Sequence, residues 1–513
     1  MKNEKDNGGP REIIGRASVT AAGTIYQQGL SFLSGLIVAR VIGAAEYGIF
    51  NLARTLVELT AIVTRLGLDI GLQRFFGEAA WGHDPTYAAA VLRRLRLLAS
   101  TLALLPTAAV ALGLGRVLES HVYQFPQFAN ILLALALILP FLTDIAILGG
   151  AYRGILKLSP TVLAESVLLP TVRLLVIVIL FAVGWRLWAV VVGTVVGSFL
   201  ASALLSLRAR SDFRVAPAAR PASSADLLQV LSYSSVLAAA LLVATLTNNM
   251  DLLVLGRFAT AEALGQYSLV KMLLVLTGVF GTALTSGLGS LIAARYARGD
   301  TEGMVRVMSL TCRLVTLVTL PIFAVFLFWG AQLALLFGPS FAVSQSVVGW
   351  LAASQFVFTV FAPAGWALSM TGRHLVELKI LSFVLLLSAV SCLIAVPAFG
   401  QLGAAVAAFG AWATTGFVRV VLVRRVLGAF PFGADIFVIT TTGILLAWVS
   451  YELAAQLSSS SLWNTVIGIA GFSLLYGIAN WTYFLSESER NGISSAFGAT
   501  AARLLGRTVN ARG

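Results

Sequence analysis

Apolar segments of about twenty residues, separated by short polar stretches, recur from one end of the chain to the other. A helix of that length crosses the hydrocarbon core of a bilayer and satisfies its own backbone hydrogen bonds there. The pattern therefore predicts an all-α polytopic membrane protein with fourteen transmembrane helices. We expect these helices at residues 17–40, 47–69, 88–114, 128–150, 158–183, 187–207, 229–255, 263–292, 305–330, 343–369, 376–398, 402–423, 433–454 and 462–485.

The composition agrees with this class. Of the 513 residues, 58% are hydrophobic and only 11% are charged, whereas about 25% are charged in an average soluble protein. These values exclude a soluble multidomain enzyme. The two cysteines, Cys312 and Cys392, fall in apolar segments far apart in the sequence. We therefore expect no disulfide, no metal site and no cofactor.

The net charge of +13 would suggest a nucleic-acid partner in a soluble chain. Its distribution gives a different explanation. With the N-terminus inside the cell, 26 of the 35 lysines and arginines lie in inner loops or at the span ends beside them. The outer side holds four: Arg40, Arg116, Arg186 and Arg257. The positive-inside rule therefore predicts a protein of the cell (inner) membrane with both termini cytoplasmic, contacting membrane lipids and no nucleic acid.

A Pro-, Ala-, Ser- and Arg-rich interruption follows the sixth span and divides the chain. We expect two six-helix lobes, one on each side of it, and two extra helices at the C-terminal end. The predicted parts are a cytoplasmic N-terminus (1–16), an N-lobe (17–207), a linker (208–227), a C-lobe (228–427), spans thirteen and fourteen (428–485) and a cytoplasmic tail (486–513).

A short internal repeat supports the two lobes. At an offset of 217 residues, Gly48 to Leu56 (GIFNLARTL) overlays Gly265 to Leu273 (GQYSLVKML). The overlay places Arg54 on Lys271. Because six spans separate the copies, both halves run the same way through the membrane, as a parallel repeat about an axis along the membrane normal.

Polar residues gather on the first two spans of each half. In the second span, Asn51, Arg54, Glu58 and Arg65 fall within a narrow wedge of one helical face. Buried charge of this kind must face protein or water and not lipid. We therefore expect a polar cavity, to which these further residues also contribute: Gln27, Ser31, Asn248, Asn249 and Lys271.

The cations suggest what the cavity binds. A charge near the bilayer centre costs about 3 kcal/mol on insertion scales. Glu58 lies one helical turn from Arg54, but no acid lies at that spacing beside Lys271. A net positive cavity suits a phosphate or pyrophosphate, which arginine can bind bidentately. The alternative is that Arg54, Glu58 and Arg65 form a structural ladder of ion pairs.

Other charged positions have several interpretations. Asp69 and Arg74 end the second span at the inner surface and form either a gate or a salt bridge, and we place Asp251 with them as a gate or interface residue. Asp144, Glu165 and Arg173 are expected to pair within the first lobe. Further along, Gly193 and Gly197 form a small-xxx-small pattern, which predicts close helix packing.

The run LIVARVIGAAEYGIFNLARTLVELTAIVTRLGLDIGLQRFF (36–76) resembles the N-terminal signature of polysaccharide-transporter (Wzx-type) flippases of the multidrug/oligosaccharidyl-lipid/polysaccharide superfamily. The segment NNMDLLVLGRF (248–258) looks like its counterpart in the second half. The resemblance implies transport of a polyprenyl-pyrophosphate-linked oligosaccharide from the inner to the outer leaflet. Related peptidoglycan-precursor flippases carry cavity cations on helices two and eight, where Arg54 and Lys271 fall. Their cations on helix one have no equivalent here, because Arg40 lies at the outer end.

We therefore expect an alternating-access flippase for surface or exopolysaccharide assembly, in which residues 17–207 rock against residues 228–427. Polysaccharide polymerase and assembly proteins are its expected partners. The alternative is a cation-coupled multidrug exporter of the same superfamily, which should favour acids in the cavity. A membrane glycosyltransferase would need a large acidic outer loop, and an ATP-driven pump would need a phosphate-binding loop that does not occur. We expect a transporter and not an enzyme, with no catalytic residues.

Overall fold

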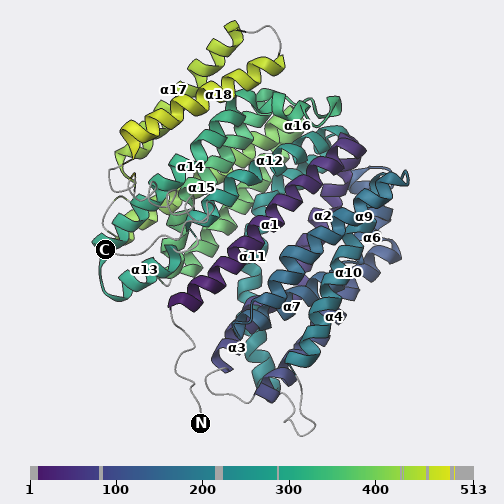
Figure 1. Cartoon of the computed structure of the whole chain (residues 1–513). Coiled ribbons are helices and arrows are strands. Elements are labelled where there is room, and N and C mark those ends of the chain that lie inside the picture. Colours follow the sequence, from purple (N-terminus) through teal and green to yellow (C-terminus); the bar gives the residue numbers. More distant parts are fainter. Residues whose placement is uncertain are drawn as a thin grey trace, which may run out of the picture. The chain divides into compact units, whose positions relative to one another are not determined.

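The computed structural model describes residues 10–79, 85–213, 223–285, 288–371, 373–427, 430, 432–457, 461–485 and 490. Every regular element in these ranges is helical (Figure 1). The α-helices are α1 (Pro10–Ile42), α2 (Ala44–Arg65), α3 (Leu68–Ala79), α4 (Pro85–Ala109), α5 (Gly115–Val117), α6 (Phe128–Ala136), α7 (Leu139–Gly154), α8 (Ser159–Thr161), α9 (Leu169–Ala182), α10 (Leu187–Asp212), α11 (Ser224–Phe258), α12 (Ala261–Thr285), α13 (Leu288–Ala297), α14 (Thr301–Leu335), α15 (Gln345–Met370), α16 (His374–Leu427), α17 (Ala434–Leu457) and α18 (Ser461–Ala479). Turns of π-helix occupy Val110–Leu114, Leu118–Tyr123, Val162–Leu168 and Asn480–Phe484, and a 3-10 turn occupies Pro339–Phe341.

Eleven stretches of the described residues are helical, long and apolar enough to span a bilayer. The chain is therefore a multi-span membrane protein. The eleven do not include α2, which carries the charged wedge, or α12. One of them, Leu375–Arg425, contains Gly400 at φ 55°, where two helices meet at a kink within α16. The count of fourteen stays a prediction.

The contacts divide the chain into two compact units. The first unit comprises residues 1–276, 334–354 and 374–415, and the second comprises 277–333, 355–373 and 416–513. These boundaries cut through α12, α14, α15 and α16 and differ from the expected lobes, so the lobe boundaries stay a prediction. The middle of the expected linker, 214–222, lies outside the described residues, as do residues 1–9 and most of the tail.

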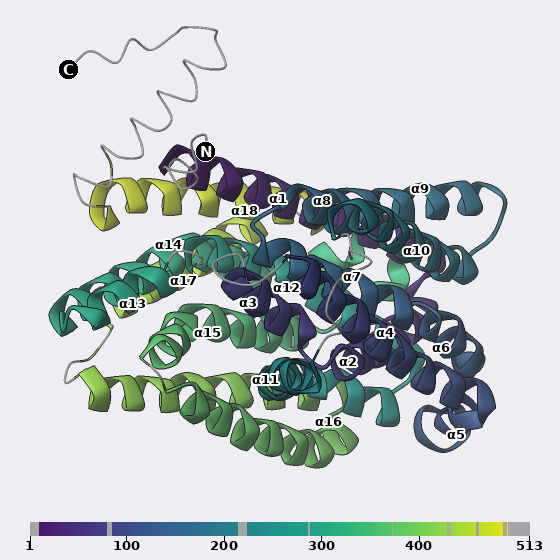
Figure 2. The same ribbon diagram turned by 90° about the horizontal axis from the view of Figure 1, so that it is seen from below.

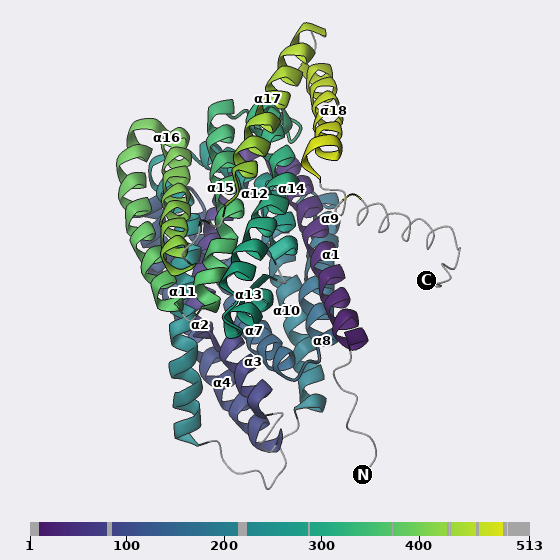
Figure 3. The same ribbon diagram turned by 90° about the vertical axis from the view of Figure 1, so that its left-hand side faces the viewer.

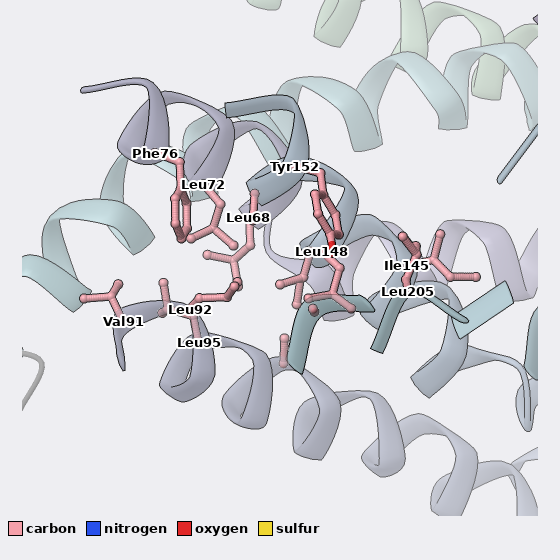
Figure 4. Packing of buried hydrophobic residues seen from close by; sticks show 14 of the residues in the cluster. Leu68, Leu72, Phe76, Val91, Leu92, Leu95, Ile145, Leu148, Tyr152 and Leu205 are labelled. Carbon is pink, nitrogen blue, oxygen red and sulfur yellow. The ribbon is translucent and has the colours of Figure 1, made fainter. Parts of the chain in front are cut away.

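One hydrophobic cluster of the first unit fixes the position of α3. Leu68, Leu72 and Phe76 are almost fully buried. They pack against residues of α4, α7 and α10 (Figure 4), which include Val91, Leu92, Leu95, Ile145, Leu148, Tyr152 and Leu205. Burial of a large apolar side chain contributes about 1.5–3 kcal/mol. The cluster therefore anchors α3 to three other helices.

The expected span 47–69 is wrong at its end. α2 stops at Arg65 because Leu66 (φ 51°) and Gly67 (φ 68°) adopt left-handed conformations. Gly67 approaches the backbone of Ser234 on α11 so closely that a Cβ atom would overlap it. The chain therefore turns here, and Asp69 and Arg74 lie on the separate helix α3.

The prediction of close packing at Gly193 and Gly197 is confirmed. α9 and α10 run side by side (Figure 2). A Cβ atom on Gly193 would lie 2.9 Å from the carbonyl oxygen of Arg173, and one on Gly197 would lie 2.9 Å from that of Leu169. The two glycines thus bring the backbones of α9 and α10 into direct contact.

In the second unit, α17 and α18 are neighbours (Figure 3). Gly468 of α18 faces the indole ring of Trp329, and the hydroxyl of Tyr476 donates a hydrogen bond to the carbonyl oxygen of Leu317 at 3.0 Å. Arg313 of α14 pairs with Asp435 of α17 at 3.3 Å. These contacts attach the C-terminal helices to α14.

Candidate functional site

The polar wedge of α2 carries an ion pair whose two side chains are only partly buried. Arg54 Nε donates to Glu58 Oε1 at 2.7 Å, and the two side chains are 41% and 48% exposed. The opposite side of the helix is buried, for example at Leu52 and Ala53. Asn51, in the same wedge, donates a hydrogen bond to the carbonyl oxygen of Tyr47 on its own helix at 2.8 Å. The charged face of α2 therefore points away from the packed core.

Arg65 belongs to a second pair further along the chain. Its Nη1 atom lies 3.7 Å from Asp69 Oδ2 on α3. The pairs Arg54–Glu58 and Arg65–Asp69 are thus separate interactions and not one continuous ladder. Arg74 of α3 lies over the ring of Tyr233 on α11, with 4.4 Å between the guanidinium carbon and the ring centroid.

Lys271 of α12 has a counter-ion that helical spacing could not reveal. Its Nζ atom donates to both carboxylate oxygens of Asp251 on α11, at 2.8 and 3.1 Å, and to the carbonyl oxygen of Asn248 at 2.7 Å. Tyr267 donates to the same carboxylate at 2.6 Å. The Asp251 side chain is 5% exposed and that of Lys271 is 24% exposed. Asp251, expected at a gate or interface, is therefore the neutralising partner of Lys271.

Three of the other predicted polar residues, Asn249, Gln27 and Ser31, form hydrogen bonds within their own half of the chain. Asn249 donates to the carbonyl oxygen of Thr245 on its own helix at 2.9 Å, whereas the side chain of Asn248 is exposed. On α1, Gln27 accepts a hydrogen bond from Ser166 at 3.4 Å. Ser31, one turn further, accepts one from Arg173 of α9, also at 3.4 Å.

Among the described residues, Asp144 and Glu165 form ion pairs within the first lobe, but with other arginines and not with Arg173. Asp144 instead binds Arg96 of α4, and it accepts hydrogen bonds from Ser202 and Ser206 of α10 at 2.7 and 2.9 Å. Glu165 pairs with Arg153 at 3.8 Å.

Arg173 lies with the α2 wedge, because its electrostatic neighbours include Arg54, Glu58 and Tyr47. Part of this arrangement follows from the sequence, because Gln27 and Ser31 are four residues apart on one face of α1. Their partners lie on two different elements: Ser166 on the π-helical turn Val162–Leu168, and Arg173 on α9.

α2 and α12 cross through a reciprocal contact of small residues. A Cβ atom on Gly48 would lie 2.5 Å from both the Ala261 carbonyl oxygen and the Gly265 nitrogen, and one on Gly265 would overlap the backbone of Ala44. Gly48 pairs with Gly265, and Ala44 with Ala261, at the offset of 217 predicted from the sequence. The contact has the reciprocity that the repeat requires, although the symmetry of whole lobes stays a prediction.

Arg54 and Lys271 are placed equivalently with respect to this crossing. Each lies six residues beyond its own glycine, which is about 9 Å along an α-helix at a rise of 1.5 Å per residue. Each is also paired with one acid, Glu58 or Asp251. The exposed pair lies within α2, and the largely buried pair joins Lys271 of α12 to Asp251 of α11.

Two family descriptions match the chain. One, "Polysaccharide biosynthesis protein", matches residues 15–288, which is more than half of the chain. The other, MatE, matches residues 237–394. The chain is also 22% identical over 463 residues to the probable low-salt glycan biosynthesis flippase Agl15 of Haloferax volcanii, covering 88% of this chain and 92% of the relative.

Solved structures agree on the fold. The lipid II flippase MurJ in an inward closed conformation is similar with a TM-score of 0.72 and 12% identity, covering 91% of this chain and 99% of that chain. An inward-facing multidrug resistance MATE family transporter of the MOP superfamily is similar with a TM-score of 0.63 and 15% identity, covering 81% and 98%. The helical membrane fold is thus that of this superfamily, and the resemblance of residues 36–76 to its polysaccharide-transporter branch is confirmed. The chain belongs to the polysaccharide biosynthesis protein family of the multidrug/oligosaccharidyl-lipid/polysaccharide superfamily.

Proposed function

We propose that this protein moves a lipid-linked oligosaccharide with a diphosphate headgroup from the inner to the outer leaflet of the cell membrane. The family match and the similarity to a glycan biosynthesis flippase support a lipid-linked glycan as the cargo. The sugar and diphosphate would occupy a polar cavity beside α1 and α2, while the lipid tail stays in the bilayer. The transported unit would then serve polymerase and assembly proteins at the cell surface.

The observation that carries this proposal is the exposed Arg54–Glu58 pair on a helix of a membrane protein. A charged side chain facing hydrocarbon costs about 3 kcal/mol or more, so this face requires water or a polar ligand. A diphosphate oxygen can replace Glu58 as the partner of Arg54 and form a charge-assisted, bidentate contact. The free energy of that contact offsets part of the cost of moving a charged headgroup across the membrane.

The proposed mechanism is alternating access by rocking of residues 17–207 against 228–427, with both termini cytoplasmic. The crossing of α2 and α12 supports it. Gly48 and Gly265 meet through backbone atoms, without a charged pair between them. Such a contact can open and close again without leaving a buried charge unpaired.

The test is transport by the full chain in liposomes loaded with a fluorescent diphosphate-linked oligosaccharide. Arg54→Gln removes the guanidinium, and we expect the flipping rate to fall about tenfold or more, since hydrogen bonds to charged groups contribute about 1.5–3 kcal/mol. Arg54→Lys should retain part of the rate. The matched control is Arg306→Gln, because Arg306 and Glu302 form a pair of the same spacing whose side chains are 78% and 86% exposed. An unchanged rate in Arg54→Gln contradicts the proposed role of this face.

Export of cationic compounds is a second candidate function. The MatE match over residues 237–394 and the similarity to a multidrug resistance transporter favour it. Such cargo would need a free acid, but Glu58 and Asp251 each pair with a cation. Ethidium efflux from the same liposomes, combined with no movement of the glycan lipid, would support export over flipping.

A further inference from the structure

The backbone of α9 is held in place at Arg173 by α10. Gly193 packs on the carbonyl oxygen of Arg173, and Gly197 lies where a Cβ atom would be 3.3 Å from the Cβ atom of Arg173. This contact leaves no space for a long side chain between the two helices. The guanidinium of Arg173 is therefore directed away from α10, toward Ser31 of α1.

Arg173 is incompletely bonded in that position. Its Nη2 atom donates to Ser31 Oγ at 3.4 Å, a long and therefore weak hydrogen bond. Its Nε atom is buried and has no hydrogen-bond partner among the residues that the structure describes. An unsatisfied buried donor costs about 1–3 kcal/mol, more when the group is charged. A site with such a donor favours a ligand that brings acceptor oxygens.

The charges near Arg173 do not balance. Arg54 and Arg173 are electrostatic neighbours and share Glu58, whose carboxylate is already bonded to Arg54. This group of three thus carries one excess positive charge. By contrast, Asp251 neutralises Lys271 through two hydrogen bonds. The excess charge is therefore located where α1, α2 and α9 meet.

We propose that Arg173 and Arg54 together form the subsite for the diphosphate, with one guanidinium for each phosphoryl group. The inference rests on the proposed function and extends it, because it adds a residue of α9 to the predicted site. Each guanidinium has a planar fork of donors that matches two oxygens of one phosphoryl group. Ser31 orients Arg173, and Glu58 gives up its bond to Arg54 when the ligand binds.

A subsite with two guanidinium groups should distinguish a diphosphate from a monophosphate. A monophosphate can engage only one of them fully, whereas a diphosphate engages both. The subsite therefore selects for the diphosphate, and removal of either arginine should reduce that preference. This selectivity is the property to measure, because a merely structural role of Arg173 would not change it.

The experiment uses the purified full chain in detergent and measures binding of polyprenyl diphosphate and polyprenyl monophosphate by thermophoresis. We expect Arg173→Gln to weaken diphosphate binding about 10- to 100-fold and to reduce the preference over monophosphate. Arg173→Lys should keep part of the affinity, and Ser31→Ala should cause a smaller loss. In the double variant with Arg54→Gln, the two losses should not add, because both side chains hold one ligand. Arg306→Gln serves as the control for a general loss of positive charge.

The outcomes separate the inference from the proposed function. If Arg54→Gln weakens diphosphate binding while Arg173→Gln binds like the native chain, the role of Arg173 is wrong and the proposed function stands. If the native chain binds neither phosphate ligand and binds cationic dyes, the proposed function itself fails. If Arg173→Gln does not yield folded protein, the diphosphate affinity and selectivity of Arg173→Lys and Ser31→Ala test the role of Arg173 instead. Native selectivity in both of these would overturn the inference.

Discussion

The reciprocal crossing of α2 and α12 predicts that alanine is not tolerated at either of its glycines. In Gly48→Ala the new Cβ atom would lie 2.5 Å from two backbone atoms of α12, whereas ordinary contacts begin at 3.4 Å. Backbone atoms cannot rotate away as a side chain can, so α12 must retreat by about 1 Å. Gly265→Ala meets the backbone of Ala44 in the same way.

The magnitude follows from the cost of overpacking. Inserting one methyl group into a close-packed contact costs about 1–3 kcal/mol. Because about 1.4 kcal/mol corresponds to a factor of ten, the closed crossing should lose about 5- to 150-fold in population relative to open arrangements. Both variants should therefore unfold at a lower temperature in detergent and flip the glycan lipid more slowly.

The control is Gly29→Ala on α1, where a Cβ atom has no other atom within 4 Å. Alanine there should leave stability unchanged or raise it by about 0.5–1 kcal/mol through its better helix propensity. The double variant Gly48→Ala/Gly265→Ala should cost less than the sum of the single variants, since one separation of the helices accommodates both methyl groups. If Gly48→Ala were as stable and active as Gly29→Ala, the crossing could not be the close contact described above.

Three further predictions concern buried polar contacts and helix packing. Asp251→Asn leaves Lys271 with an uncompensated charge and should lower the free energy of unfolding by about 3–5 kcal/mol, measured by thermal unfolding. Adding Lys271→Met should restore much of this loss, and a double variant as unstable as Asp251→Asn would argue against the pair. Tyr267→Phe removes one hydrogen bond to Asp251 and should cost about 1–2 kcal/mol by the same measurement, so a neutral effect would show that this bond contributes nothing. Gly197→Leu must separate α9 from α10 at Leu169 and should abolish folded protein in size-exclusion chromatography, whereas a normal elution profile would contradict the close contact of these helices.

Much of the fold follows from the sequence, because membrane-spanning helices are recognisable from the length and apolarity of their segments. The end of α2 was not predictable in this way. Residues 47–69 form one apolar stretch whose charged residues fall on one helical face. This pattern does not indicate that Leu66 adopts a left-handed conformation. The break depends on the approach of Gly67 to the backbone of α11, which is a tertiary contact.

The candidate site was predictable within a helix and not between helices. The Arg54–Glu58 pair follows from a spacing of four residues on one helix, and the structure has it. The partner of Lys271 lies 20 residues earlier, on α11, and is reached only by packing α11 against α12. The neighbours of Arg173 are not predictable from spacing for the same reason, because those on α1 and α2 are more than a hundred residues away in the sequence.

The contact of Gly48 with Gly265 also bears on how such a chain can arise. Each half supplies the same pair of small residues, alanine and glycine four positions apart, to the same contact. Two copies of one polypeptide make this kind of self-complementary contact across a two-fold axis. A half-length chain carrying this alanine and glycine would present the same self-complementary surface to a second copy of itself.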